Sequence, residues 1–191
     1  PQSPLLVTRE AKHLSLILNA PESHNEIDIH LRDAFCEAFE LALIDKTIET
    51  LSLSAIGKSF SIGGALSEFG QVADPATAHW IRSVRLPGRL LARLVWRDNP
   101  VYVRTYLNGP AIGAGLELAA FAHEVTAHPK AWTQLPEIRM GLIPGAGGTV
   151  SVSRRIGRHK TAYMVLTGKR IKAETAYKWG LIDNIETRMV T

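Results

Sequence analysis

The chain has 191 residues, of which 46% are hydrophobic, and its formal net charge is +4. This length and composition predict a globular protein with a sizeable core, and no apolar run reaches the roughly 18 residues of a membrane span. Cys36 is the only cysteine, which excludes an internal disulfide. We therefore expect a soluble, cytoplasmic protein without a membrane partner.

The only dense basic run is RRIGRHK, residues 154–160. It has no interleaved aromatic residues of the kind that stack on bases, so we expect no nucleic-acid partner. An anionic small molecule, such as a nucleotide-bearing thioester, suits the same charge. The seven histidines show no metal-ligand spacing, and His123 and His128 are most simply surface or loop residues, so we expect no metal.

The first third of the chain alternates strand and helix patterns. Short β-branched or apolar segments at 5–10 and 14–18 predict strands. Apolar residues at helical spacing predict an amphipathic helix from Ile27 to Ile44. A further strand, 50–56, runs directly into the glycine-rich stretch GKSFSIGGAL, residues 57–66.

The rest of the chain repeats this order. Residues 74–98 are helical in pattern on both sides of a break at Pro87-Gly88. We predict strands at 101–107 and 124–127, and helices at 115–122, 149–156, 160–167 and 173–180. A strand, a glycine loop and a helix follow one another at least twice, which indicates an α/β protein whose loop-to-helix amides face a common cleft. No linker divides the chain, so residues 1–191 are expected to form a single domain.

The glycine-rich stretches do not match known phosphate-binding motifs. GKS at 57–59 would need a glycine at Ser52 to be a P-loop. Dinucleotide fingerprints starting at Gly113 or Gly145 lack their third glycine, because Leu118 and Val150 occupy those places.

Glycine loops have a second use, because they let backbone N–H groups approach a ligand closely. Loops at Gly63-Gly64 and Gly113-Ala114 would aim two N–H groups at one carbonyl oxygen, which is an oxyanion hole. Taken singly, each loop is more typical of an ordinary tight turn.

Two glutamates are the candidate acid and base. Glu117 interrupts the apolar run 111–122, and an unpaired buried carboxylate is costly; its structural alternative is a salt bridge or an exposed position. Glu137 lies between Pro136 and an apolar run, where a lone glutamate is more often a helix-start or loop residue. Two carboxyls in a dry cleft can divide proton transfer between water and carbon.

Three motifs together resemble the crotonase superfamily, also called the enoyl-CoA hydratase/isomerase family. They are GKSFSIGGAL, NGPAIGAGLELA (108–119) and PEIRMGLIPGAGGT (136–149), with LNAPESHNEI (18–27) similar to the family's early motif. The resemblance implies a crotonase-like spiral of ββα repeats with short C-terminal helices. It also implies an acyl-CoA thioester substrate, no cofactor beyond the coenzyme A that the substrate carries, and a homo-oligomer, a trimer.

The resemblance assigns roles to individual residues. Glu117 and Glu137 correspond to the two catalytic glutamates of family hydratases, and the N–H groups of Gly64 and Ala114 to the oxyanion hole. On this reading the stretch IPGAGGT, 143–149, is a turn that follows the second catalytic position. The predicted substrate-binding residues are Ser61, Ile62, Gly63, Ala65, Leu66, Gly113, Trp132 and Pro136.

The implied reaction is hydration of a 2-enoyl-CoA to a 3-hydroxyacyl-CoA. An enoyl-CoA isomerase, an acyl-CoA thioester hydrolase and a catalytically inactive acyl-CoA-binding subunit are the alternatives. Family members usually continue for tens of residues past the segment resembling KWGLIDNI, 178–185, whereas this sequence has six more. We therefore expect the trimerisation helices to be truncated.

Overall fold

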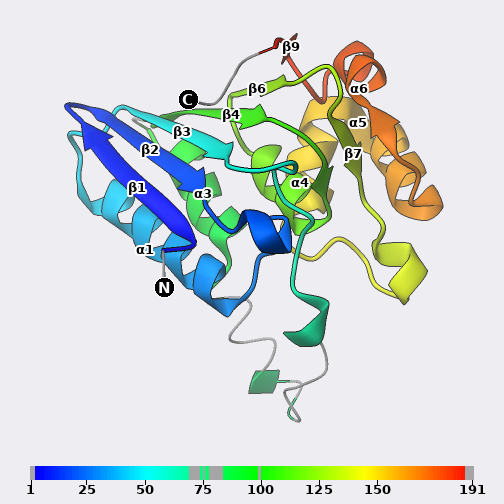
Figure 1. Ribbon diagram of the computed structural model, residues 1–191, viewed down its shortest axis with the longest axis horizontal. Helices are drawn as coiled ribbons and strands as arrows, with labels where there is room; N and C mark the ends of the chain where they lie inside the picture. The colour runs from blue at the N-terminus through cyan, green and yellow to red at the C-terminus, as the bar shows by residue number, and fades with distance from the viewer. Residues whose placement is uncertain (1–2, 69–73, 75, 78–83, 99, 188–191) are drawn as a thin grey trace.

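A computed structural model describes residues 3–68, 74, 76–77, 84–98 and 100–187 (Figure 1). A six-stranded sheet has the order β1-β2-β3-β4-β6-β9. β1 pairs with β2 antiparallel, and every later pair in this sheet is parallel. The strands are β1 (Leu5–Glu10), β2 (His13–Leu18), β3 (Thr50–Ala55), β4 (Tyr102–Leu107), β6 (Glu124–Ala127) and β9 (Asn184–Ile185). This mixture of parallel strands and helices confirms the predicted α/β class.

A second, three-stranded sheet stands beside the first. It has the order β5-β7-β8, with β5 (Ala111–Ile112), β7 (Trp132–Gln134) and β8 (Ile171–Lys172). Because β5 follows β4 and leads into a helix, this small sheet fixes where that helix begins. Gly113 N–H donates to the Gln134 carbonyl at 2.9 Å.

Alternating side chains of β2 and β3 form one wall of the core. Leu14, Leu16 and Leu18 are buried and lie opposite Leu51, Leu53 and Ala55 in the parallel register. The intervening residues of both strands are only half-buried. The period of two in the sequence therefore determines which face of the sheet meets the helices.

The helices differ from the predictions mainly at their ends. They are α1 (Ile29–Ile44), α3 (Pro87–Trp96), α4 (Ala114–Ala119), α5 (Gly148–Thr167) and α6 (Ala173–Trp179), with 3-10 turns η1 (Pro21–Ser23), η2 (Leu66–Glu68) and η3 (Glu137–Met140). α1 starts two residues later than predicted, because the Asp28 side chain accepts a hydrogen bond from Leu31 N–H and caps the helix.

Two predicted breaks have different outcomes. The predicted break lies just before Pro87, because Arg85 and Leu86 are not helical; Pro87 itself is the first residue of α3, where its missing N–H costs nothing. Most of the predicted helix before it lies outside the described residues. The two predicted helices at 149–156 and 160–167 are the halves of α5, which joins them across Gly157 at φ 76° and ψ 163°. No helix of the described residues is long and apolar enough to cross a membrane.

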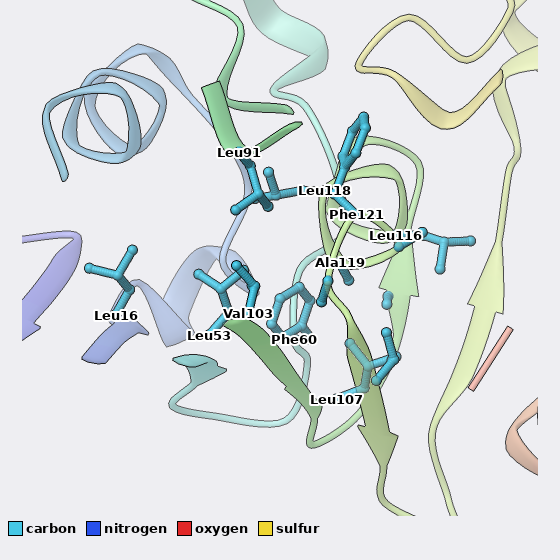
Figure 2. Packing of buried hydrophobic residues seen from close by; sticks show 14 of the residues in the cluster. Leu16, Leu53, Phe60, Leu91, Val103, Leu107, Leu116, Leu118, Ala119 and Phe121 are labelled. Atoms are coloured by element: carbon cyan, nitrogen blue, oxygen red, sulfur yellow. The ribbon is translucent and has the colours of Figure 1, made fainter. Parts of the chain in front are cut away.

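α4 is the central helix of the molecule, with apolar contacts on several sides. Figure 2 shows Leu118 pointing toward Leu91 of α3 and Leu116 pointing to the opposite side. Phe121, just after the helix, lies close to glycines of two other elements, since a Cβ on Gly88 or on Gly147 would come within 2.9 Å of its ring. A polar residue on α4 is therefore held within a packed interior.

The loops at the ends of β3 and β4 lie directly against each other. A Cβ on Gly109 would be 2.1 Å from the Lys58 carbonyl oxygen, so only glycine allows this approach. Phe60 and Ser61 N–H groups both donate to the Pro110 carbonyl, and Ile112 N–H donates to the Ser61 carbonyl. These contacts bring the first and second glycine-rich motifs together.

Asn25 supports the same loops from the N-terminal side. Its side chain is fully buried, accepts from Ala20 N–H at 2.8 Å, and donates to the carbonyls of Ile56 and Ser59 at 3.0 and 2.9 Å. Its backbone is left-handed, with φ 56°, a conformation that asparagine tolerates better than most residues. The sequence analysis did not single out this residue.

We predict that Asn25→Ala lowers the free energy of unfolding by about 2–4 kcal/mol, because it removes three hydrogen bonds of a fully buried side chain. Urea denaturation measures the change. The control is Asn19→Ala, which removes one exposed hydrogen bond to the Ser3 carbonyl and is expected to cost less than about 0.5 kcal/mol. Equal effects of the two substitutions would contradict this account.

Candidate active site

Glu117 is a buried carboxylate held by backbone amides. It lies on α4 with 1% of its surface exposed, and its Oε2 accepts hydrogen bonds from Ala146 N–H at 2.8 Å and Gly148 N–H at 2.6 Å. Gly148 is the first residue of α5, so the carboxylate also meets the positive end of that helix. No salt bridge to Glu117 exists among the described residues, which removes that alternative.

The stretch 143–149 therefore does more than the turn that the sequence predicted. Its amides bind an anion, and that anion is the protein's own glutamate. The clue in the sequence was the combination of a glycine run before a helix and a lone carboxylate in an apolar segment, because the carboxylate needs donors and the glycines expose them.

α5 meets α4 with no spare room around this carboxylate. A Cβ on Gly148 would lie 2.5 Å from Glu117 Cγ, so any larger residue there would displace the side chain. Ser151 Oγ donates to the Glu117 backbone carbonyl at 2.8 Å, which ties the first turn of α5 to α4. Both the side chain and the backbone of Glu117 are thus held by one helix.

Glu137 approaches the same interior from η3. It is buried, with 8% of its surface exposed, and its Oε2 has no hydrogen-bond partner in the described part of the chain. A Cβ on Gly113 would be 2.8 Å from Glu137 Oε1, so the carboxyl lies against the residue that precedes α4. The structure thus brings Glu137 to the helix that carries Glu117.

The protonation of the two glutamates is coupled. Burial raises the pKa of Glu117 to about 7, the negative charge of Glu137 adds to the rise, and the amides of Gly148 and Ala146 oppose it. Burial also raises the pKa of Glu137. Two carboxyls in one dry region do not both ionise easily, so the charge of one favours the protonated form of the other.

The two predicted donor loops also lie side by side. Gly63 has φ 96°, and a Cβ on it would be 3.4 Å from the Ala114 backbone nitrogen. Within the described residues neither Gly64 N–H nor Ala114 N–H donates a hydrogen bond, whereas their neighbours Ala65 and Gly113 do. Two unused donors on adjoining loops fit an oxyanion hole, an assignment that stays a prediction.

The other predicted substrate-binding residues fall into two groups. Ser61 is buried, and its Oγ accepts from Gly63 N–H at 3.1 Å, so it shapes the first loop from within. Ile62 and Leu66 are exposed, Ala65 is buried and Pro136 is half-buried. Trp132 lies under the Arg170 guanidinium at 4.3 Å on β7, and its predicted place in an acyl pocket stays a prediction.

No group of three or more potential metal ligands occurs among the residues that the structure describes. His123 has a structural contact instead, because its Nδ1 accepts from Val103 N–H at 3.0 Å and its ring stacks on Tyr102. Burial lowers the pKa of His123, which favours the neutral acceptor form.

Comparison with known proteins identifies the family of the chain. The model of the enoyl-CoA hydratase/isomerase family matches residues 9–190. The chain belongs to the enoyl-CoA hydratase/isomerase family. It spans between 58% and 69% of the length of curated relatives that are 30–33% identical to it.

Individual members of the family resemble the chain over most of its length. A 2,3-dehydroadipyl-CoA hydratase of Escherichia coli is 33% identical over 183 residues, covering 96% of this chain and 69% of the relative. A trans-2-decenoyl-[acyl-carrier-protein] isomerase of Streptococcus mutans is 30% identical, covering 90% and 65%. The crystal structure of an enoyl-CoA hydratase from Mycobacterium smegmatis superimposes with a TM-score of 0.85 at 26% identity, covering 96% and 70%. The predicted crotonase-like fold is confirmed.

We predict that ionisation of Glu117 lowers the free energy of unfolding of the protein as the pH rises to and above neutrality. The native pKa of about 7 exceeds the ordinary value of 4.5, so between these values the folded state binds more protons than the unfolded state. The free energy of unfolding then falls as the pH rises through this window. Glu117→Gln removes roughly 3 kcal/mol of that fall, since each pKa unit corresponds to about 1.4 kcal/mol.

The measurement is urea denaturation of both proteins from pH 5 to pH 8. The control is Glu40→Gln, an exposed carboxylate on α1, which is expected to leave the pH dependence unchanged. A Glu117→Gln protein that is no more stable than wild type at pH 8 would show that the amides of 146 and 148 fully offset the cost of burial.

Proposed function

We propose that the chain is an enoyl-CoA hydratase that adds water across the double bond of a 2-enoyl-CoA thioester. The observation that carries this proposal is the unequal environment of two neighbouring buried glutamates. Glu117 Oε2 accepts two N–H groups, whereas Glu137 Oε2 accepts none within the described residues. Such a pair suits one base and one acid acting on the same substrate.

Amide donors favour the ionised form of a carboxylate, so Glu117 is the base. When Glu137 is protonated, its charge no longer raises the pKa of Glu117, and the donors at Ala146 and Gly148 favour the ionised form of Glu117. Glu137 has a pKa that burial raises, and its Oε2 accepts no hydrogen bond within the described residues, so we assign it as the acid.

The proposed reaction begins at the thioester carbonyl. The N–H groups of Gly64 and Ala114 donate hydrogen bonds to its oxygen and stabilise the negative charge that develops there, which makes the β-carbon electrophilic. Water attacks that carbon and gives its proton to Glu117, while the electrons of the double bond move into an enolate. The enolate then takes the Glu137 proton at the α-carbon, and the product is a 3-hydroxyacyl-CoA. Exchange with solvent restores the original protonation of the two glutamates.

Isomerisation of the double bond is the second candidate, and the Streptococcus mutans relative favours it. It needs the same enolate and the same donors, but only one carboxyl that carries a proton between carbons. Glu137 fits that role because its Oε2, which has no partner in the part of the chain that the structure describes, can hold a mobile proton. In that case Glu117 takes no part in proton transfer.

We predict that incubation with a panel of 2-enoyl-CoA thioesters in oxygen-18 water gives products that gain one labelled water on an intact CoA ester. Glu117→Gln and Glu137→Gln are each expected to lower the rate by roughly 10²–10⁴-fold, the usual contribution of a positioned acid or base. Glu40→Gln is the control. Mass spectrometry of the products gives the measurement.

Each other outcome assigns a different function. An unchanged mass with a shifted double bond, retained in Glu117→Gln, identifies the isomerase. Labelled free acid identifies a thioester hydrolase. Binding of the CoA esters without any product identifies an inactive acyl-CoA-binding subunit and would refute the proposal.

Ala114→Pro offers a direct test of one oxyanion donor. Ala114 is the first residue of α4, a position that accepts proline, so the substitution removes the N–H with little change of backbone. We predict a loss of about 10²–10³-fold in kcat. Ala114→Gly keeps the N–H and is the matched control, expected to stay within a few-fold of wild type. Equal kcat values for the two variants, both folded by circular dichroism, would exclude this N–H from the reaction.

A further inference from the structure

The two ends of α5 contact the two segments that carry the candidate acid and base. At its N-terminus, Gly148 N–H donates to Glu117. At its C-terminus, the Gly168 carbonyl accepts hydrogen bonds from Gln134 Nε2 at 2.7 Å and Arg139 Nη2 at 3.0 Å. These donors stand three residues before Glu137 and two residues after it.

The fit around Gly168 is close. Gly168 is the left-handed cap of α5, with φ 55°, and a Cβ on it would lie 3.2 Å from Arg139 Nε and 3.5 Å from Ile138 Cγ2. The side chains of Arg139 and Ile138 on η3 therefore lie directly over the end of the helix. A guanidinium at this end also meets the negative pole of the helix dipole, which strengthens the contact.

The position of Glu137 depends on contacts of its neighbours, because its own side chain makes few hydrogen bonds. Its Oε2 lacks a partner within the described chain, and η3 is a turn of only four residues. The turn closes on itself through Leu142 N–H to the Glu137 carbonyl at 3.0 Å and Arg139 N–H to the Pro136 carbonyl at 2.9 Å. The side chain of Arg139 joins η3 to the C-terminal end of α5, the helix whose N-terminus holds Glu117.

We propose that Arg139 is a positioning residue, which sets the place of Glu137 relative to Glu117 through the Gly168 carbonyl, with Gln134 as its buried partner on the same oxygen. α5 thereby acts as a spacer between acid and base. This inference deepens the proposed function and rests on it for its kinetic consequence.

The test compares two substitutions that remove one positive charge beside Gly168. Arg139→Met keeps an unbranched stem over the glycine and removes the donors to its carbonyl. Lys169→Met removes the neighbouring exposed cation, whose amine lies 5.8 Å from the Tyr163 ring centre and makes no hydrogen bond to Gly168. Arg139→Lys restores the charge and one flexible donor without the planar fork.

We expect Arg139→Met to lower kcat for enoyl-CoA on the order of tenfold with KM within about twofold, because a displaced acid affects the transition state more than substrate binding. Arg139→Lys should be intermediate and Lys169→Met close to wild type. In the Glu137→Gln background, Arg139→Met should cause no further loss, because its effect acts through Glu137. Equal kcat for Arg139→Met and Lys169→Met would overturn the proposal.

A second readout does not require turnover. Carbon-13 NMR of labelled glutamate follows the titration of Glu137 in the free protein. Arg139→Met should release η3 from the Gly168 carbonyl and so reduce the burial that raises the pKa of Glu137, moving that pKa toward the ordinary value of 4.5, whereas Lys169→Met should not. If no enoyl-CoA is turned over, the proposed function fails, and this titration still decides the positioning role. An unchanged titration in Arg139→Met would overturn it.

Discussion

The hydrogen bonds from Ala146 and Gly148 N–H to the Glu117 carboxylate are the contact on which the site depends. They join α4 and α5, which come from different motifs of the sequence, and they allow an acidic side chain to remain inside a packed interior. An uncompensated carboxylate there would cost several kcal/mol. The amides reduce this cost without removing it, because burial still raises the pKa of Glu117 to about 7.

The glycines of this protein are needed for close contacts more than for flexibility. Gly109 lets two strand-end loops touch, Gly148 leaves room for Glu117 Cγ, and Gly113 leaves room for Glu137. Each would bring a Cβ within 2.8 Å of a neighbour, and those neighbours include both candidate catalytic side chains. Gly109 brings the second glycine-rich motif against the first, at Lys58. Gly113 and Gly148 let the two glutamates approach the backbone of the second and third motifs.

The sequence predicted the fold class and most strands and helices, because each has a local signal, whereas the roles of the candidate site residues came from the family resemblance and stay predictions. Alternation marked β2 and β3, and the lone acid in an apolar run marked Glu117. The supporting contacts had no such signal. Asn25 lies 31 residues from the Ile56 carbonyl that it binds, and Arg139 lies 29 residues from Gly168, so only the folded chain brings these partners together. The same limit applies to the role of residues 146 and 148, whose partner is Glu117 on another helix.

Hydrogen exchange of the loop that holds Glu117 depends on whether this carboxyl is ionised. Gly145 and Thr149 are exposed on either side of Ala146 and Gly148, so water has access to this part of the chain. The amide protons of Ala146 and Gly148 are nevertheless withheld from water for as long as Glu117 Oε2 accepts them. Protonation of that carboxylate weakens both hydrogen bonds and frees the protons to exchange. Deuterium uptake at these two amides therefore records the ionisation of a buried side chain that has almost no solvent contact of its own.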